Sequence, residues 1–149
     1  MKVKPDCVYV IPPNKDMSIL RGVLHLFEPT AARGLRLPID FFLRSLAEDR
    51  QERSIGVILS GMGSDGTLGL NAIKAQGGLT LAQQPESAQF DSMPNSAIAA
   101  GYADIVAPPA ELPARVLRVL AAQHATSPHT EIADDGNQQV LHSILRLLR

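Results

Sequence analysis

The sequence predicts an α/β fold built on a parallel sheet, and one stretch near the middle of the chain carries most of the evidence. Residues 54–60 (SIGVILS) form an apolar run broken by one glycine, which is typical of a strand buried on both faces and predicts a central strand of the sheet. Glycines then interrupt residues 61–66, after which Leu70 and Ile73 follow the spacing of a helix with one apolar face. Residues 79–83 (LTLAQ) return to a strand pattern. This order of strand, turn, helix and strand predicts a βαβ unit, which joins parallel neighbours.

The elements before this stretch are shorter. Residues 7–13 (CVYVIPP) predict a short strand that two prolines end, because proline cannot donate to a sheet ladder. Residues 17–20 and 22–27 predict two extended runs that form a small antiparallel addition to the edge of the main sheet. Pro38 and Asp40 open a helix, and we expect Asp40 to be its N-cap. The apolar stripe of this helix consists of Phe42, Leu43, Leu46 and Ala47.

The elements after this stretch continue the alternation of helix and strand. Pro94 suits the first turn of a short helix that ends at Gly101. Residues 103–108 (ADIVAP) predict one more buried strand, and residues 109–122 a further amphipathic helix. The predicted α/β core closes with that helix.

The domain organisation follows from where this alternation stops. We expect residues 1–122 to form the α/β domain, because a chain of 149 residues holds one domain of ordinary size. Residues 123–137 lack apolar spacing and predict a linker. Residues 138–149 (QQVLHSILRLLR) predict an amphipathic helix with a broad apolar face, which needs a surface to pack against.

Composition excludes several classes of function. The formal net charge is −1 and no basic stripe is present, so we expect neither a nucleic acid nor an anionic membrane surface as partner. The single cysteine, Cys7, excludes an internal disulfide and is expected to be a small buried hydrophobe. Together with the lack of a signal peptide or long apolar run, this predicts a cytoplasmic location and no membrane insertion. The spacing of cysteine and histidine fits no metal site, and no cofactor is expected.

The glycine turn 61–66 is where chemistry is expected, because ligands of open α/β sheets bind outside the carboxyl ends of the strands. Gly61, Gly63 and Gly66 fit the GxGxxG fingerprint of dinucleotide-binding domains. That fingerprint also needs an acidic residue at the end of the next strand, where this chain has glutamines. Asp65 would in addition repel the phosphates. Nucleotide binding is therefore the weakest of the alternatives.

A purely structural interpretation of the same turn is also open. Asp65 precedes the helix and belongs to the residue types that are best at capping a helix N-terminus. Under this interpretation Ser60 and Ser64 are hydroxyls of the turn, Met62 fills the core, and His25 lies on one face of an edge strand. Position alone favours this interpretation of Asp65.

The wider pattern favours catalysis. The runs YVIPPNKDMSIL and RLPIDFFLRSLAEDRQERSIGVILSGMGSDGTLGLNAIKAQGGLTLAQQPESAQFDSMPNSAIAAGYADIVAPPAELP closely resemble the chemotaxis protein-glutamate methylesterases of the CheB type. The resemblance covers about residues 5–120 and depends most on GMGSDG between PIDFFLRS and GGLTLAQ. It implies a three-layer, doubly wound, mainly parallel sheet. It also implies hydrolysis of glutamyl methyl esters on chemotaxis receptors, with release of methanol, by a Ser-His-Asp triad.

The resemblance implies roles for three residues of the turn. Asp65 would be the triad aspartate that orients a histidine and stabilises its imidazolium form. Met62 and Gly61 would line the oxyanion side of the site, the former through its backbone N–H. The turns 12–16 and 84–94 would border the cleft.

The chain departs from this family in one important respect. Family members carry the nucleophilic serine in a GxSxGG turn and the histidine in a following QHM-type segment, and neither motif is present in these 149 residues. The chain alone is therefore expected to be inactive. The first strands of the family sheet would also be missing, which predicts self-association through an open sheet edge. A non-catalytic interaction segment remains the alternative function.

Residues 138–149 are similar to the first helix of chemotaxis receptor methyltransferases of the CheR type. In known hybrids such a domain follows the esterase. An ordinary amphipathic helix gives the same pattern, so both interpretations stay open. The first predicts that the chain is a slice of an esterase-methyltransferase hybrid.

Overall fold

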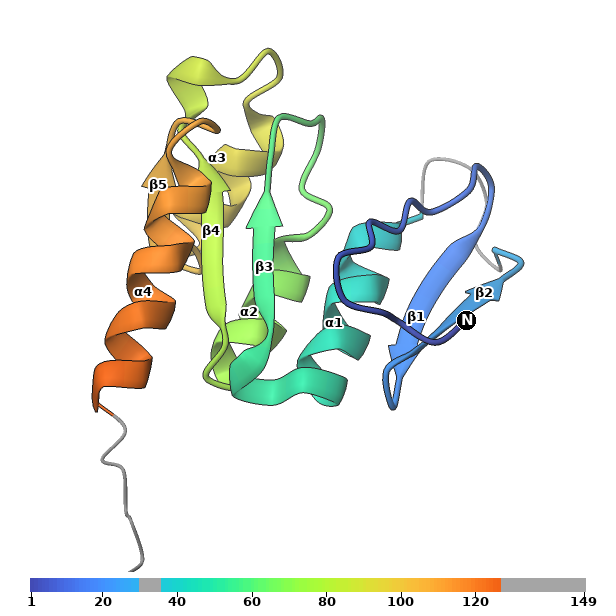
Figure 1. The fold of residues 1–149 in the computed structure, drawn as a ribbon. Coiled ribbons are helices and arrows are strands. Elements are labelled where there is room, and N and C mark those ends of the chain that lie inside the picture. The colour runs from blue at the N-terminus through green and yellow to red at the C-terminus, as the bar shows by residue number, and fades with distance from the viewer. Residues whose placement is uncertain (30–35, 127–149) are drawn as a thin grey trace, which may run out of the picture. The chain divides into compact units, whose positions relative to one another are not determined.

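A computed structural model describes residues 1–29 and 36–126 of the chain (Figure 1). Residues Met1–Val116 form one compact unit, separate from the residues that begin at Leu117. The helices and strands are β1 (Asp16–Leu20), β2 (Val23–Phe27), α1 (Pro38–Arg50), β3 (Ile55–Ile58), α2 (Thr67–Ala75), β4 (Leu79–Gln83), α3 (Ser92–Ala99), β5 (Ile105–Ala107) and α4 (Leu112–Thr126). Two short 3-10 turns, Gln51–Arg53 and Pro85–Ser87, precede β3 and α3.

The parallel sheet has the order β3-β4-β5, and both of its strand pairs are parallel. The βαβ unit predicted from the glycine turn is therefore confirmed. The run 54–60 was expected to be a central strand, and that expectation is wrong for the described residues, because β3 lies at one edge and β4 in the middle. The apolar pattern of the sequence does not distinguish a central strand from an edge strand, because an edge strand that helices cover is also apolar.

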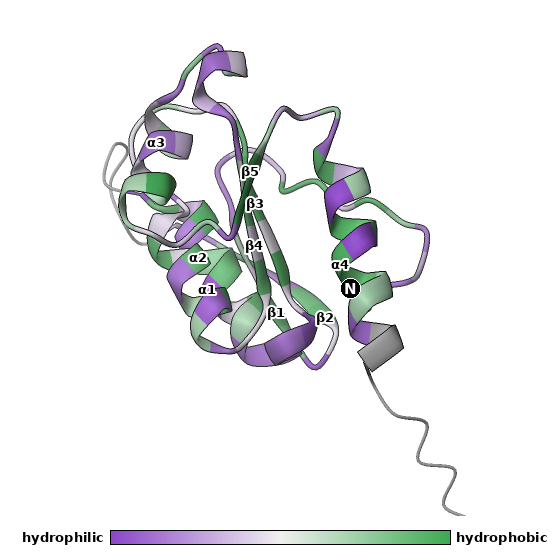
Figure 2. Cartoon of the chain, turned by 90° about the vertical axis from the view of Figure 1, so that its left-hand side faces the viewer, coloured by the Kyte–Doolittle hydropathy of each residue, from purple (hydrophilic) through white to green (hydrophobic). Residues whose placement is uncertain are grey.

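Two apolar clusters lie on the two faces of this sheet, which makes the unit three-layered (Figure 2). Helices α1, α2 and α3 cover one face, and the first turns of α4, Leu112–Val116, cover the other. The first cluster consists of Leu43, Ala47, Ile58, Leu70, Ile73, Met93 and Ala97. The second consists of Leu81, Ala107 and Leu112, with Ile55, Leu79, Ile105 and Val116 packed against it. This arrangement is the three-layer α/β fold that the sequence predicts.

The antiparallel runs form a separate hairpin rather than an addition to the main sheet. β1 and β2 form a two-stranded sheet with Ser18 opposite His25, and an isolated bridge joins Val23 of β2 to Lys2. The hairpin is attached to α1 instead, because Ser45 Oγ accepts the Ile19 N–H at 3.0 Å and the Asp49 carboxylate accepts the Gly22 N–H at 3.2–3.3 Å. His25 is exposed on β2, as the structural interpretation expected.

The predicted strand at residues 7–13 is absent from this part of the structure. Val8 and Val10 are 91% and 84% exposed, and Cys7 is exposed rather than buried. The reason is that a strand needs a neighbour to complete its backbone hydrogen bonds, and none of the described strands pairs with these residues. The apolar alternation of the sequence is present without the partner that would make it a strand.

Helix α4 runs to Thr126, four residues beyond the end predicted for it. Ala121 and Ala122 favour a helix strongly, and no glycine or proline interrupts the chain before Pro128. Most of the predicted linker 123–137 and the whole predicted helix 138–149 lie outside the described residues, so the domain organisation stays a prediction. Within the described residues no helix is both long and apolar enough to cross a membrane.

A polar cluster joins α2, β4 and β5 near the amino ends of the strands. The Asp104 carboxylate forms an ion pair with Lys74 and accepts hydrogen bonds from Thr80 Oγ1 at 2.7 Å and Thr80 N at 3.3 Å. Burial raises the pKa of Asp104, but the hydrogen bonds from Lys74 and Thr80 and the charge of Lys74 outweigh it. The pKa of this carboxyl therefore lies below its ordinary value.

We predict that Asp104 makes the stability of the fold depend on pH. Since its pKa is lower in the folded than in the unfolded chain, its contribution is complete above the unfolded value of about 4 and is lost as pH falls further. In urea unfolding, Asp104→Asn should lower the free energy of unfolding at pH 7. The difference from the parent should shrink below about pH 4. Asp91→Asn, which changes an exposed carboxylate, is the control and should show no such convergence. A difference that is constant with pH would contradict the prediction.

Candidate active site

The glycine turn 61–66 follows the carboxyl end of β3, beside the loop and 3-10 turn that follow β4 (Figure 1). The Gly61 N–H donates to the Phe90 carbonyl at 2.9 Å, and the Gly61 carbonyl accepts the Met93 N–H at 3.1 Å. The turn is thus bound to the segment 84–94 through its backbone. Residues of two neighbouring βα connections meet at this end of the sheet, which is where ligands of such folds bind.

Side chains fasten the same two segments together. Gln83, buried at the end of β4, accepts the Ser60 N–H through Oε1 at 2.9 Å and donates through Nε2 to the Ser87 carbonyl at 2.9 Å. Ser92 Oγ accepts the Gly63 N–H at 3.1 Å and donates to the Gly61 carbonyl at 3.2 Å. The turn is therefore held from both of its sides.

Met62 lies in the middle of the held turn, and its backbone differs from that of its neighbours. The N–H groups of Gly61 and Gly63 both donate to protein acceptors, whereas the Met62 N–H has no partner among the described residues. Its side chain is 73% exposed, so the prediction that Met62 fills the core is wrong. A free N–H on a rigid turn is a suitable donor for a developing oxyanion.

Asp65 directs its carboxylate to the start of α1. Its Oδ2 accepts the Ile39 N–H at 3.1 Å and its Oδ1 accepts the Asp40 N–H at 2.9 Å. It is half-buried. Two hydrogen bonds do not exhaust a carboxylate, which offers about four lone-pair sites, so Asp65 can also accept an imidazole N–H.

The interpretation of Asp65 as the N-cap of the next helix is wrong. The N-cap of α2 is Gly66, which has a φ of 92° and makes no side-chain capping bond. That left-handed backbone favours glycine, and a Cβ at this position would also collide with Ile58. The turn of the chain at Gly66 separates the Asp65 side chain from the amides of its own helix.

The expectation for Asp40 is also wrong, for a related reason. Leu37 is the N-cap of α1 and Pro38 is its first residue, so Asp40 is the third residue of the helix. The Asp40 side chain is 4% exposed, and its Oδ1 accepts the Gly69 N–H of α2 at 2.6 Å. It therefore caps a neighbouring helix rather than its own.

Sequence reasoning missed three polar residues that shape this region, namely Asp40 in its true role, Gln83 and Ser92. Only Gln83 left a signal, because an amide at the end of an otherwise apolar strand needs partners for its polar atoms. Asp40 and Ser92 act on backbone groups 29 residues away in the chain. No local pattern reports contacts over such separations.

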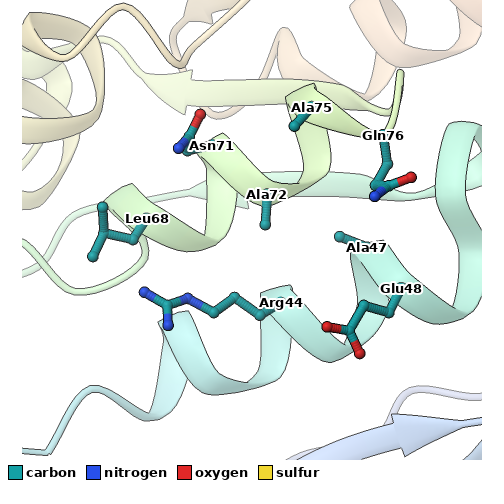
Figure 3. Close-up of a pocket in the computed structure, with 8 residues that line it drawn as sticks. All are labelled: Arg44, Ala47, Glu48, Leu68, Asn71, Ala72, Ala75 and Gln76. Atoms are coloured by element: carbon teal, nitrogen blue, oxygen red, sulfur yellow. The ribbon is translucent and has the colours of Figure 1, made fainter.

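Two surface cavities lie beside helix α1. A groove of about 350 Å³ runs between α1 and α2 (Figure 3) and is lined by Arg44, Ala47, Glu48, Leu68, Asn71, Ala72, Ala75 and Gln76. It includes none of the predicted site residues. A cavity of about 420 Å³ beside the start of α1 is lined by Ile11, Pro12, Pro13, Asn14, Lys15, Arg36 and Pro38. The turn 12–16 thus lies next to the helix end that Asp65 binds.

Titratable side chains elsewhere add no metal centre within the described ranges. No group of three or more histidine, cysteine, aspartate or glutamate residues there is arranged to hold a metal ion. The turn presents a carboxylate, that of Asp65, and a backbone N–H, that of Met62.

The fold and the turn define a doubly wound α/β catalytic domain with a carboxylate after an edge strand. A family model described as CheB methylesterase matches residues 1–116. The chain therefore belongs to the CheB methylesterase family.

Similar proteins extend well beyond the matched region. The chain is 33% identical over 123 residues to a protein-glutamate methylesterase/protein-glutamine glutaminase of Thermotoga maritima, covering 80% of this chain and 36% of that protein. It is 46% identical over 104 residues to an uncharacterized 104.1 kDa protein of Rhodobacter capsulatus, covering 70% of this chain and 11% of the relative. The chain thus spans about a third and about a tenth of these relatives.

A solved structure gives the same result for the fold. The crystal structure of the Thermotoga maritima CheB methylesterase catalytic domain superimposes with a TM-score of 0.70 at 33% identity. The match covers 80% of this chain and 65% of that one. About a third of the solved domain therefore has no counterpart in the match.

We predict that Gln83 holds the turn through the Ser60 amide. Gln83→Leu keeps the side-chain volume but removes the hydrogen bonds that the Gln83 side chain makes. The free energy of unfolding in urea should therefore fall by about 1–2 kcal/mol. Amide hydrogen exchange at Ser60 should become faster. Gln84→Leu is the matched control, since the described residues give the Gln84 side chain no hydrogen bond, and it should leave both measurements unchanged. Equal effects of the two variants would contradict the role of Gln83.

Proposed function

We propose that residues 1–116 are part of the catalytic domain of a protein-glutamate methylesterase that acts in the cytoplasm on methylated chemotaxis receptors. The substrate is a glutamyl methyl ester and the products are the free carboxylate and methanol. One observation carries the proposal: the GMGSDG turn offers a carboxylate, Asp65, and a free N–H, Met62, at the carboxyl end of β3. Family membership supports the same reaction class.

In the proposed mechanism a serine attacks the ester carbonyl while a histidine takes its proton. Asp65 accepts the N–H of that histidine, fixes its tautomer and stabilises the imidazolium cation. The Met62 N–H, with Gly61 beside it, donates to the oxyanion of the tetrahedral intermediate. Collapse of the intermediate expels methanol, which takes its proton from the histidine, and water then hydrolyses the serine ester by the same steps.

The serine and the histidine of this mechanism come from outside the 149 residues. No serine of the chain lies in a GxSxG arrangement. The Thermotoga maritima relative is also named as a protein-glutamine glutaminase, and deamidation of a glutamine side chain is attack on the same acyl carbon with ammonia as leaving group. The same site would serve both reactions.

We predict that Asp65→Asn, in the complete protein that carries this domain, lowers kcat by about four orders of magnitude. The amide cannot hold the reactive histidine tautomer or stabilise its cation. The measurement is methanol release from a methylated receptor fragment. Asp104→Asn, at the other end of the strands, is the control and should keep the parental rate at neutral pH. An unchanged rate for Asp65→Asn would remove this residue from the mechanism.

An assay of the purified 149-residue chain tests the esterase proposal against the non-catalytic alternative. The chain should release no methanol above background, because it lacks the nucleophile and its base. Turnover by the purified chain would contradict the proposal that the serine and the histidine come from outside it. If activity were lost neither in the Asp65 variant nor in a variant of the nucleophilic serine of the complete protein, a non-catalytic interaction segment would be the better description.

We propose further that the open edge of β3 binds another strand, which in the isolated chain is β3 of a second copy. Within the described residues β3 pairs only with β4, so one row of its backbone groups has no strand partner. Val57 on β3 and Leu59 just after it are 40% and 48% exposed. An apolar edge of this kind favours pairing with a further strand.

The proposed edge pairing predicts concentration-dependent association. Val57→Lys should shift the isolated chain toward monomer in sedimentation velocity, because a lysine at an edge opposes strand pairing. Leu117→Lys introduces the same charge at an exposed position of α4 and should leave association unchanged. A parent chain that is monomeric at all concentrations would overturn the proposal.

We also propose that the chain is a slice of an esterase-methyltransferase hybrid. The resemblance of residues 138–149 to a methyltransferase helix supports it. A relative of 104.1 kDa, of which the match covers 11%, shows that this domain also occurs in much larger polypeptides.

A further inference from the structure

We propose that Asp40 is a positioning residue for the reaction, which acts by holding the helix to which Asp65 is bound. This inference rests on the proposed function, because it assigns Asp40 a role through Asp65. The starting observation is an exchange of helix caps between α1 and α2. Each of two neighbouring helices, α1 and α2, is capped by an aspartate from the other side of their interface.

The first half of the exchange concerns α1. Pro38 has no N–H, and the next two N–H groups, those of Ile39 and Asp40, both donate to Asp65. The Phe41 N–H then makes the first helical bond, to the Leu37 carbonyl at 3.0 Å. Asp65 therefore satisfies every unpaired donor of the first turn of α1. The direction of its carboxylate is set by where α1 begins.

The second half concerns α2. Its N-cap, Gly66, has no side chain, and the Gly69 N–H donates to Asp40 Oδ1 at 2.6 Å. A Cβ at Gly69 would lie 2.5 Å from the Leu43 Cβ, so the two helices are in close contact here. Asp40 is almost fully buried and thus performs for α2 the task of an N-cap side chain.

Together the bonds form a closed ring. Asp65 precedes α2 and binds α1, while Asp40 lies in α1 and binds α2. Each carboxylate lies at the positive end of a helix dipole, which offsets the repulsion between the two negative charges. Loosening Asp40 lets α1 move relative to α2, and the Ile39 and Asp40 amides then carry the Asp65 carboxylate with them.

The consequence for catalysis is geometric. A triad aspartate must keep its acceptor oxygen within hydrogen-bond distance of an imidazole, and displacements well below 1 Å already slow such reactions. Asp40 does not touch the reacting atoms in the proposed mechanism. It limits the positions that Asp65 can take.

The first experiment uses the complete protein and receptor methyl ester hydrolysis. Asp40→Ala should lower kcat on the order of tenfold with little change in KM, since substrate contacts are untouched. Asp40→Asn keeps Oδ1 as an acceptor and should recover most of the rate. In an Asp65→Asn background, Asp40→Ala should cause no further loss of kcat, because the residue it positions is already disabled.

Asp104→Ala is the matched control for general destabilisation, because it removes another carboxylate that binds backbone amides and α2. It should lower stability without the kcat effect. Equal kcat losses for Asp40→Ala and Asp104→Ala at matched stability would overturn the proposal. So would full additivity of Asp40→Ala and Asp65→Asn.

The second experiment needs no activity and uses the 149-residue chain. Amide hydrogen exchange at Ile39 should be faster in Asp65→Ala and also in Asp40→Ala, relative to Asp104→Ala. Exchange at Gly69 should be faster in the first two variants as well. If Asp40→Ala does not fold, Asp40→Asn replaces it, with a smaller effect of the same sign. Unchanged exchange at Ile39 would overturn the ring. A complete protein without esterase activity would overturn the proposed function alone.

Discussion

The structure depends on two carboxylates that cap each other's helices. Helix α1 begins with N–H groups that no residue of its own segment accepts, and α2 begins after a glycine that has no side chain to offer. Asp65 and Asp40 supply the missing acceptors across the interface. The β1-β2 hairpin is in turn bound to α1 through Ser45 and Asp49, so these hydrogen bonds link the hairpin to the parallel-sheet unit.

The two ends of the parallel strands perform different tasks. At the amino ends, Lys74, Thr80 and Asp104 join helix and strands through an ion pair and hydrogen bonds, which stabilise the fold. At the carboxyl ends, Gln83 and Ser92 hold the glycine turn, in which the Met62 N–H has no partner among the described residues. Rigid support beneath a free donor is what an oxyanion site requires. The turn therefore combines a constrained backbone with groups available for chemistry.

The open edge of β3 is the other main constraint. In a parallel sheet an edge strand can receive further strands, and these would bring side chains to the same end of the sheet. Val8, Val10 and Val57 are apolar side chains that are exposed to solvent. The same edge is the surface at which we propose that a further strand binds.

The sequence by itself determined the order of strands and helices, the hairpin and the place of the glycine turn, because apolar periodicity and glycines act over a few residues. Its periodicity did not reveal that residues 7–13 would lack a strand partner, and an open sheet edge was implied only by the family resemblance. Nor did it assign Asp40 and Asp65 correctly as caps, since both were judged against their own helices. Only the tertiary structure decided these points. Parallel strand pairing joins residues 24 positions apart and capping across the helix interface joins residues 25 or more positions apart, so these partners are brought together only by packing.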